Sequence, residues 1–273
     1  MAELEYRPYP APPATAHAVR AIWTLRGRAY VGAVEPIVSD ACPELVFNAG
    51  DPWLQLHADG TVSLQPTAML VGPTARPTFV EPGRDVNVLG VRLHPWGLSS
   101  LVGIGAAELK DLLVPLDVVS ARLGRLADEV LDAMTGPDPI AGVSGALGRA
   151  LAPTTSPTTT TRRLVEVASS AGESPTTVRA LAARFGMSTR GVQRAFRHDV
   201  GLSPTTLFRI ARVQRALRLA EAHPEQPWSR IGAMAGYYDQ PHLVREFRAL
   251  VGRLPSEHRP DDASLTSTFV DAS

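Results

Sequence analysis

Hydrophobic and polar positions along the first hundred residues follow the short runs and alternation that are typical of strands. Runs with strand composition, each stopped by Gly or Pro, cover residues 17–27, 44–50, 67–73 and 85–95. Within 54–64, Asp59-Gly60 stands between two alternating runs, which is a strong hairpin signal. The pattern therefore predicts a β-rich N-terminal part.

After about residue 113 the apolar positions change to helical spacing. Val118, Leu123, Leu126 and Val130 predict a helix over 114–134, and a second is expected over 139–151. Residues 152–161 consist only of Pro, Thr, Ser and Ala, which have nothing to bury, so we expect a flexible linker there. The pattern is then helical over 162–260, and the polar tail 261–273 is expected to be disordered.

The helical region 162–260 contains a repeat. Residues 181–204 and 231–255 share five identical residues, all 51 positions apart: Arg194/Arg245, Phe196/Phe247, Arg197/Arg248, Gly201/Gly252 and Pro204/Pro255. Val192 and Leu243 match in kind at the same offset. So many matches in so short a window indicate a duplicated supersecondary unit.

Each copy has the pattern of a helix-turn-helix. In the first, an apolar stripe ends at Gly186, which supplies the turn, and Ser188 is a suitable N-cap for the next helix. That helix buries Val192 and Phe196, and its opposite face carries Arg190, Gln193, Arg194 and Arg197.

In the second copy Gly236 begins the turn and Asp239 caps the following helix. This helix buries Leu243 and Phe247, and its exposed positions are Gln240, Pro241, Val244, Arg245 and Arg248. A connecting helix from Ser203-Pro204 to about residue 221 would span about 27 Å, enough to hold two recognition helices roughly one DNA turn apart.

The basic and acidic residues are distributed unevenly between the β-rich part and the C-terminal helical part. The formal net charge is +0, but residues 161–260 hold 16 Arg, no Lys and 8 Asp or Glu, so the rest of the chain is acidic. A basic module joined to an acidic one indicates that only the C-terminal part approaches a polyanion.

Residues 161–260 resemble the DNA-binding domain of the AraC/XylS family of bacterial transcription regulators. The resemblance rests on S-x-x-x-V-x-R-x-F-R…G-L-S-P from Ser188, and on G-Y-x-D-x-x-H-L-x-R-x-F-R…G-x-x-P from Gly236. It implies that both recognition helices enter successive major grooves of double-stranded DNA, and that RNA polymerase is a partner. It also implies an internal salt bridge for Arg212, while His242 is expected to be structural.

The resemblance further assigns base reading to both helices. The residues it implies are Arg190, Gln193 and Arg194 in the first helix, and Gln240, Pro241, Val244 and Arg245 in the second; Arg197 and Arg248 lie on the same faces. This chain departs from the family at Gly232 and Tyr237, where Ala and Phe are usual. Pro241 and Val244 offer little hydrogen bonding, which argues against strong base specificity in the second unit.

The N-terminal part, with PELVFN, VGPTA and LGVRLHPWG, resembles an uncharacterised domain often fused to this module. In the family at large such domains are cupin-like barrels or other folds that sense small molecules and dimerise. Trp53 and Trp96 are candidate effector-binding residues, although either is equally compatible with a core position, whereas Trp23 is expected in the core. No H-x-H pair occurs among the seven histidines, so we expect no metal. The sequence also has no P-loop or G-x-G-x-x-G pattern, and no cofactor is expected.

These features together predict an α+β chain with a β-rich effector-binding and dimerisation domain (1–151) and an all-α domain of two helix-turn-helix units. The predicted function is sequence-specific transcription regulation, as an effector-modulated activator or repressor. The alternatives are a regulator without an effector and a cupin-type metal enzyme with a helical appendage. The helices of 114–151 are the expected homodimer contact.

A cytoplasmic location is expected for this chain. The sequence has no apolar run near the roughly 18 residues that a membrane span needs, and its N-terminus lacks a signal-peptide pattern. The single cysteine, Cys42, fits a reducing compartment. It is interpreted as a small buried residue, with a redox sensor as the alternative.

Overall fold

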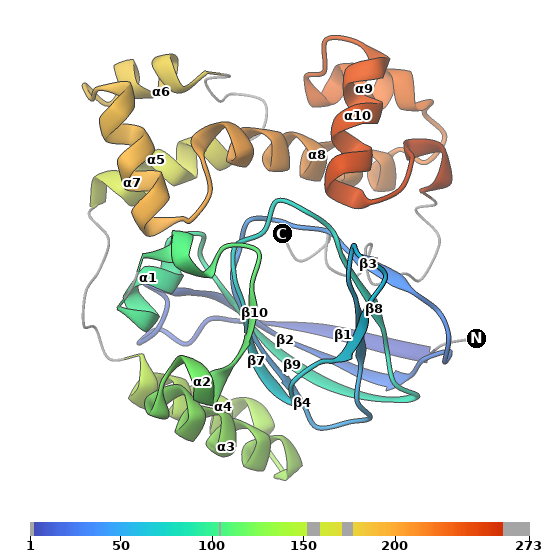
Figure 1. Cartoon of the computed structure of the whole chain (residues 1–273), viewed down its shortest axis with the longest axis vertical. Helices are drawn as coiled ribbons and strands as arrows, with labels where there is room; N and C mark the ends of the chain where they lie inside the picture. Colours follow the sequence, from blue (N-terminus) through green and yellow to red (C-terminus); the bar gives the residue numbers. More distant parts are fainter. Residues whose placement is uncertain (1–2, 104, 152–158, 171–176, 259–273) are drawn as a thin grey trace.

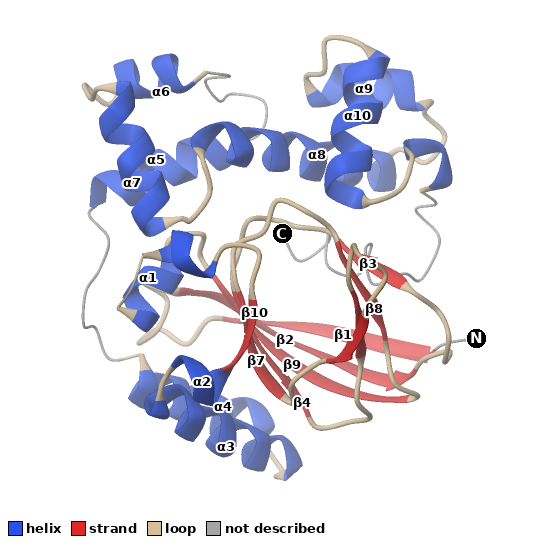
Figure 2. Ribbon diagram, in the orientation of Figure 1, coloured by secondary structure: helices blue, strands red, loops and turns tan. Residues whose placement is uncertain are grey.

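The structure is a computed structural model and describes residues 3–103, 105–151, 159–170 and 177–258. Its strands lie between two groups of helices, one formed by residues before 151 and the other by the C-terminal part (Figure 2). The α+β class and the change from a β-rich to an all-helical part are therefore confirmed. None of the described helices is long and apolar enough to cross a membrane.

Ten described strands form two antiparallel sheets. The six-stranded sheet has the order β1 (Glu3–Pro10), β2 (Val19–Arg28), β9 (Asp85–Leu93), β4 (Glu44–Asn48), β7 (Ala68–Val71) and β10 (Leu113–Pro115). The four-stranded sheet has the order β3 (Glu35–Ile37), β8 (Thr78–Glu81), β5 (Leu54–Leu56) and β6 (Val62–Leu64). The expected hairpin at Asp59-Gly60 is confirmed as β5 and β6, with Gly60 at φ 83°.

The six-stranded sheet is apolar on both faces, because one face meets helices and the other meets the second sheet. On β4, Leu45 and Phe47 face the helices, whereas Val46 belongs to the core between the sheets. The same alternation on β9 sends Val91 outward and Val88 inward. This two-sided burial explains why these strands read as nearly continuous apolar runs in the sequence.

The outer face of this sheet is covered by α1 (Gly97–Val102), η1 (Ala106–Leu109), α2 (Leu116–Val119), α3 (Ala121–Thr135) and α4 (Pro139–Ala150). The single helix expected over 114–134 is wrong at its start. Val114 and Pro115 pair with β7, and Ser120 is extended (φ −169°, ψ 152°). The hydroxyl of Ser120 accepts a hydrogen bond from the Leu123 N–H at 3.2 Å, so α3 begins only there.

The expected use of these helices as a dimer contact loses its structural basis. It rested on an apolar face that α3 and α4 would present to a second chain. Leu123, Val130, Val143 and Leu147 on these helices are all 0% exposed, because they pack against each other and the sheet. Val118, which the helical pattern also included, lies on α2 and is exposed.

The C-terminal helices are α5 (Thr159–Ser169), α6 (Val178–Arg184), α7 (Thr189–Asp199), α8 (Pro204–Ala222), α9 (Trp228–Ala235), α10 (Gln240–Val251) and η2 (Pro255–Glu257). Helix α5 was not foreseen as a separate element, and it begins inside the residues expected to form the linker. The rest of that linker, 152–158, and the tail 261–273 lie outside the described residues.

Candidate DNA-binding surface and internal cavity

Helix α7 has the position and capping of the first recognition helix. Gly186 adopts φ 62° in the turn after α6, and the Ser188 hydroxyl accepts a hydrogen bond from the Gly191 N–H at 3.0 Å. Val192 and Phe196 are fully buried on the inner face. The four polar side chains expected on the opposite face are all exposed, namely Arg190, Gln193, Arg194 and Arg197.

Helix α10 repeats this arrangement in the second unit. Gly236 adopts φ 89°, and the Asp239 carboxylate accepts a hydrogen bond from the His242 N–H at 2.7 Å. Leu243 and Phe247 are fully buried. Of the residues expected to face DNA, Val244 is half-buried and the others are exposed, namely Gln240, Pro241, Arg245 and Arg248.

Helix α8 connects the two units, and α7 and α10 lie near its opposite ends (Figure 1). It has 19 residues, which corresponds to about 28 Å. The Ser203 hydroxyl caps its first turn by accepting from the Thr206 N–H at 3.0 Å. Because α8 buries side chains along its whole length, it is a stiff spacer rather than a free helix.

A buried carboxylate, which the sequence reasoning did not single out, ties α10 to α8. Glu246 lies 3.0 Å from Arg209, 3.8 Å from Arg212 and 3.4 Å from the His242 ring. Arg212 also lies 5.2 Å from the centre of the Tyr237 ring. The ion pair expected for Arg212 is present, and the His242 ring contacts the same carboxylate, while its structural role in place of a DNA contact stays a prediction. The i, i+4 spacing of His242 and Glu246 was the sequence signal that could have revealed this cluster.

The two sheets of the N-terminal part enclose a cavity of about 600 Å³. Side chains from the inner faces of both sheets line it, including Trp23 from β2, Val46 from β4 and Val80 from β8. Trp53 lines it as well, in agreement with its candidate role, whereas Trp96 is not among the lining residues. Trp96 is instead buried in the core shared with the C-terminal helices and stacks on His94, with ring centres 4.5 Å apart.

The indole of Trp23 forms part of the cavity wall because β9 leaves space for it. A Cβ atom at Gly90, its partner in the sheet register, would collide with the indole ring. The indole N–H donates a hydrogen bond to Glu44 at 3.2 Å. Trp23 was expected only as a core residue, and it is both a core residue and a lining residue.

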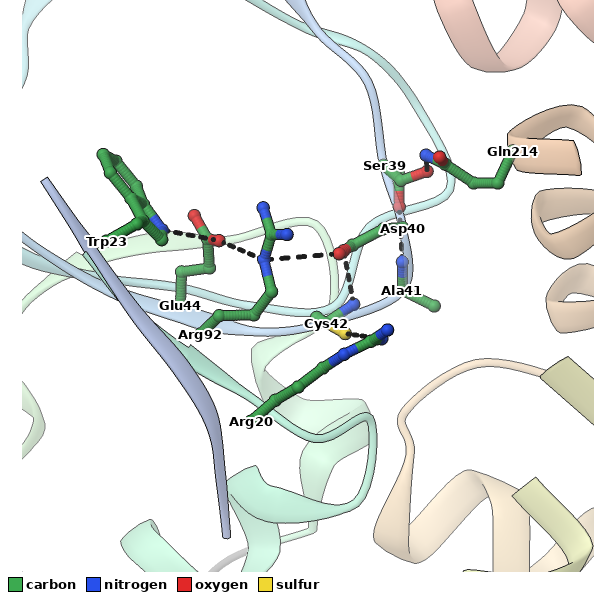
Figure 3. A network of polar contacts seen from close by, with 9 residues as sticks. All are labelled: Arg20, Trp23, Ser39, Asp40, Ala41, Cys42, Glu44, Arg92 and Gln214. Carbon is green, nitrogen blue, oxygen red and sulfur yellow. Dashed lines mark hydrogen bonds and ion pairs between the residues drawn. The ribbon is translucent and has the colours of Figure 1, made fainter. Parts of the chain in front are cut away.

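The residues that line the cavity include two carboxylates, Asp40 and Glu44, on either side of the Arg92 guanidinium (Figure 3). The Arg92 Nε atom donates to Glu44 at 2.8 Å and lies 3.4 Å from Asp40. Burial raises the pKa of Glu44, and the neighbouring Arg92 opposes that shift. Within the described residues, no group of three or more His, Cys, Asp or Glu side chains is arranged to hold a metal ion.

The cavity wall and the connector helix meet at residues 39–42. Asp40 points toward Arg92, while the backbone carbonyl of the adjacent Ser39 accepts a 2.9 Å hydrogen bond from the side-chain amide of Gln214 on α8 (Figure 3). The turn that allows this places Ala41 at φ 67°, a conformation that costs free energy in residues other than glycine. The adjacent residues Ser39 and Asp40 thus contact the connector helix α8 and a charged residue of the cavity wall, respectively.

The N-terminal part also touches both helix-turn-helix units at equivalent positions of the repeat. A Cβ atom at Gly201 would lie 2.6 Å from the Ala106 carbonyl oxygen, and one at Gly252 would lie 2.5 Å from the Phe79 ring. Both glycines have positive φ, at 76° and 84°. The two repeated glycines therefore combine a turn conformation with close approach to the other domain.

Two family models match separate parts of the chain. Residues 181–260 match the family described as "Helix-turn-helix domain", and residues 7–115 match "Domain of unknown function (DUF6597)". No curated protein matches the chain.

Solved structures that resemble the chain include two of ToxT and one of a transcriptional activator. ToxT from Vibrio cholerae O395 bound to (E)-4-(8-methylnaphthalen-1-yl)but-3-enoic acid is 11% identical, with a TM-score of 0.49 over 93% of this chain and 97% of that chain. Unsaturated fatty acid bound wild-type ToxT from Vibrio cholerae strain SCE256 is 12% identical, with a TM-score of 0.45 over 94% and 95%. The AraC-like transcriptional activator CuxR is 13% identical, with a TM-score of 0.28 over 85% and 90%.

Residues 181–260 therefore form a helix-turn-helix domain, in the part of the chain where the sequence led us to expect two such units. In this chain the helix-turn-helix domain, a fold typical of DNA-binding proteins, follows a β-rich N-terminal domain.

Proposed function

We propose that this chain is a transcription regulator that binds DNA sequence-specifically by placing α7 and α10 in successive major grooves of one duplex, and that a small molecule in the cavity changes this binding. The observation that carries the proposal is the position of two capped helices with exposed polar faces at opposite ends of one stiff connector. A connector of about 28 Å brings two helices close to the roughly 34 Å repeat of B-DNA, with the width of the helices themselves adding to the spacing.

Helix α7 would make more hydrogen bonds to base edges than helix α10. In α7, Arg190, Gln193 and Arg194 offer guanidinium and amide donors that suit guanine and adenine edges. In α10, Gln240 and Arg245 offer such groups, whereas Pro241 and Val244 can only make apolar contacts, for example with a thymine methyl group. Arg197 and Arg248, one turn further along their helices, suit phosphate contacts that add affinity without sequence choice.

Control by a small molecule is supported by the way the two domains meet. The cavity wall at residues 37–42 is continuous with the backbone that contacts α8 through Ser39 and Gln214. A ligand that changes the position of Asp40 would therefore act on the connector whose length sets the spacing of α7 and α10. Recruitment of RNA polymerase, and self-association on another surface than the buried faces of α3 and α4, remain predictions from the family resemblance.

The test starts from the full-length chain and a pool of random duplexes from which bound sequences are selected. We expect a selected site with two conserved segments about one helical turn apart. Arg194→Ala should relax base preference in one segment only, and Arg245→Ala in the other, because each arginine belongs to a different recognition helix. Arg125→Ala, an exposed arginine on α3 far from the C-terminal helices, is the matched control and should change neither.

Two results would count against the proposal. If Arg194→Ala weakens selected and scrambled duplexes by the same factor, Arg194 contacts phosphate and does not read a base. If no sequence is enriched at all, the chain lacks sequence-specific binding.

A further inference from the structure

The cavity offers more negative than positive charge. Three carboxylates line it, Asp40, Glu44 and Asp111, together with one guanidinium, Arg92, and the His57 ring. A second guanidinium, that of Arg20, lies beyond Cys42, 3.7 Å from its sulfur, and does not line the cavity. Arg92 pairs with Asp40 and Glu44, and Asp111 lies 3.6 Å from Lys110, which is not a lining residue. Because acidic groups outnumber basic ones in the lining itself, the cavity favours a cationic ligand over an anionic one.

The part of the charged cluster that reaches the cavity surface consists mainly of the acids. The Arg92 side chain is 4% exposed, whereas those of Asp40 and Glu44 are 14% and 16% exposed. The guanidinium is thus covered, whereas the two acidic side chains keep somewhat more accessible surface, although Oδ2 of Asp40 is itself buried. A ligand beside these side chains therefore meets hydrogen-bond acceptors and negative charge.

Two buried polar atoms at the cavity have no hydrogen-bond partner among the described residues. One is Oδ2 of Asp40, whose neighbour Arg92 lies at ion-pair distance, 3.4 Å. The other is the indole N–H of Trp53, a lining residue that is 7% exposed. Because buried polar groups in proteins nearly always have partners, the first atom calls for a ligand donor and the second for a ligand acceptor.

The rest of the wall is suited to an apolar body. Trp23 and Trp53 line the cavity together with Val46, Met69 and Val88. Indole faces attract cations as well as apolar groups. Their attraction therefore offsets part of the free energy that a cationic group loses when it leaves water. The volume of about 600 Å³ lies within the usual range for small-molecule sites.

We infer that the cavity binds a small organic cation, with an ammonium or amidinium group against Asp40 and Glu44, an apolar body against Trp23 and Trp53, and an acceptor atom for the Trp53 N–H. This inference rests on the proposed function only in taking the cavity as the effector site. It names the ligand class that the proposed function leaves open.

The test compares three probes that share one body and differ in charge: 5-methoxytryptamine, 5-methoxytryptophol and 5-methoxyindole-3-acetate. Their methoxy oxygen can accept from Trp53. Calorimetry on the full-length protein should show the amine binding at least about tenfold tighter than the carboxylate, with the neutral alcohol between them. Equal binding of amine and carboxylate, tighter binding of the carboxylate, or binding of none of the three overturns the inference.

Variants locate the preference in the cavity. Asp40→Asn should weaken binding of the amine at least about tenfold and leave the alcohol nearly unchanged, because only the amine loses a charge partner. Asp128→Asn, at an exposed carboxylate on α3, is the matched control and should bind all three probes like the wild type. An amine preference that survives in a folded Asp40→Asn protein contradicts the assignment. If that variant does not fold, the comparison of the three probes on the wild type still decides.

DNA binding is measured separately with the same preparations. A protein that binds a selected duplex but shows no preference for the amine retains the proposed function and loses this inference. A protein that prefers the amine but binds no duplex supports this inference and contradicts the proposed function.

Discussion

The side-chain amide of Gln214 donates a 2.9 Å hydrogen bond to the backbone carbonyl of Ser39, across 175 positions of the sequence. Gln214 lies on the connector between the two recognition helices, and Ser39 precedes an acid of the cavity wall. The Ser39 hydroxyl in turn donates to the Thr74 carbonyl at 2.5 Å, on another segment of that wall. One short contact thus joins the cavity to the helix that sets the spacing of α7 and α10.

Gln214→Met is predicted to uncouple the cavity from DNA binding. Methionine has a similar shape but cannot donate to Ser39, and the loss of one such bond should lower the free energy of unfolding by only about 1 kcal/mol. For a ligand found by thermal-shift screening, the ratio of the Kd for a selected duplex with and without ligand should move toward one. The affinity for the ligand itself should stay the same. Full coupling in the variant would show that the signal takes another route.

Gly201→Ala is predicted to destabilise the chain more than Gly186→Ala. Both glycines have positive φ, so alanine is strained at either position by about 1 to 2 kcal/mol. Only Gly201 faces the other domain, where a Cβ would lie 2.6 Å from the Ala106 carbonyl oxygen; Gly186 has nothing within 4 Å. The extra loss in free energy of unfolding should be about 1 to 3 kcal/mol in urea titrations. Equal losses would mean that the domains do not touch at Gly201 in solution.

Glu246→Gln is predicted to loosen the second helix-turn-helix unit. The change removes the charge that pairs with Arg209 and Arg212 while the cluster remains partly buried, so we expect a loss of about 1 to 3 kcal/mol in the free energy of unfolding. Glu225→Gln, at an exposed glutamate, should have almost no effect. DNA selection with the folded variant should show weaker preference in the α10 segment alone. A variant as stable as the wild type would rule out a structural role for the Glu246 charge.

Cys42 is predicted to be inert in the native protein. Burial raises the pKa of its thiol, with the nearby Asp40 adding to the shift, so little thiolate is present near neutral pH. Iodoacetamide at pH 8 should modify native protein at least about tenfold more slowly than protein unfolded in urea, as followed by mass spectrometry. Equal rates would favour the redox-sensor interpretation of this cysteine.

Elements that the sequence predicts well are those in which local chemistry and packing point the same way. The caps at Ser188, Ser203 and Asp239, the turns at Gly186 and Gly236, and the buried positions of both recognition helices all follow from side chains within a few residues of each other. The 51-residue repeat added long-range information, because each copy confirmed the pattern of the other. This is why the caps, turns and buried positions of the two helix-turn-helix units were predictable from the sequence, although helix α5 of the same domain was not.

Features that depend on contacts distant in the sequence were not predictable in the same way. Residues 113–115 join β7 rather than extend a helix, and the pairing of Val114 with Leu70 leaves no local signal. The three-residue strand β3 carries too few positions for a period to be recognised. Helix α5 does have periodic buried positions at Leu164, Val165 and Ala168, but its first residues are threonines of the same composition as the expected linker. The cavity cluster unites Asp40, Glu44 and Arg92 from separate segments, so only the folded sheets reveal it.

The most direct test of the central claim is a methylation-protection footprint of the full-length protein on a selected duplex. Two helices held at the ends of α8 should protect guanine N7 atoms in two major-groove segments whose centres lie about 10 base pairs apart on one face of the DNA. Protection of a single segment, or of two segments on opposite faces, would contradict the claim that α7 and α10 occupy successive major grooves together.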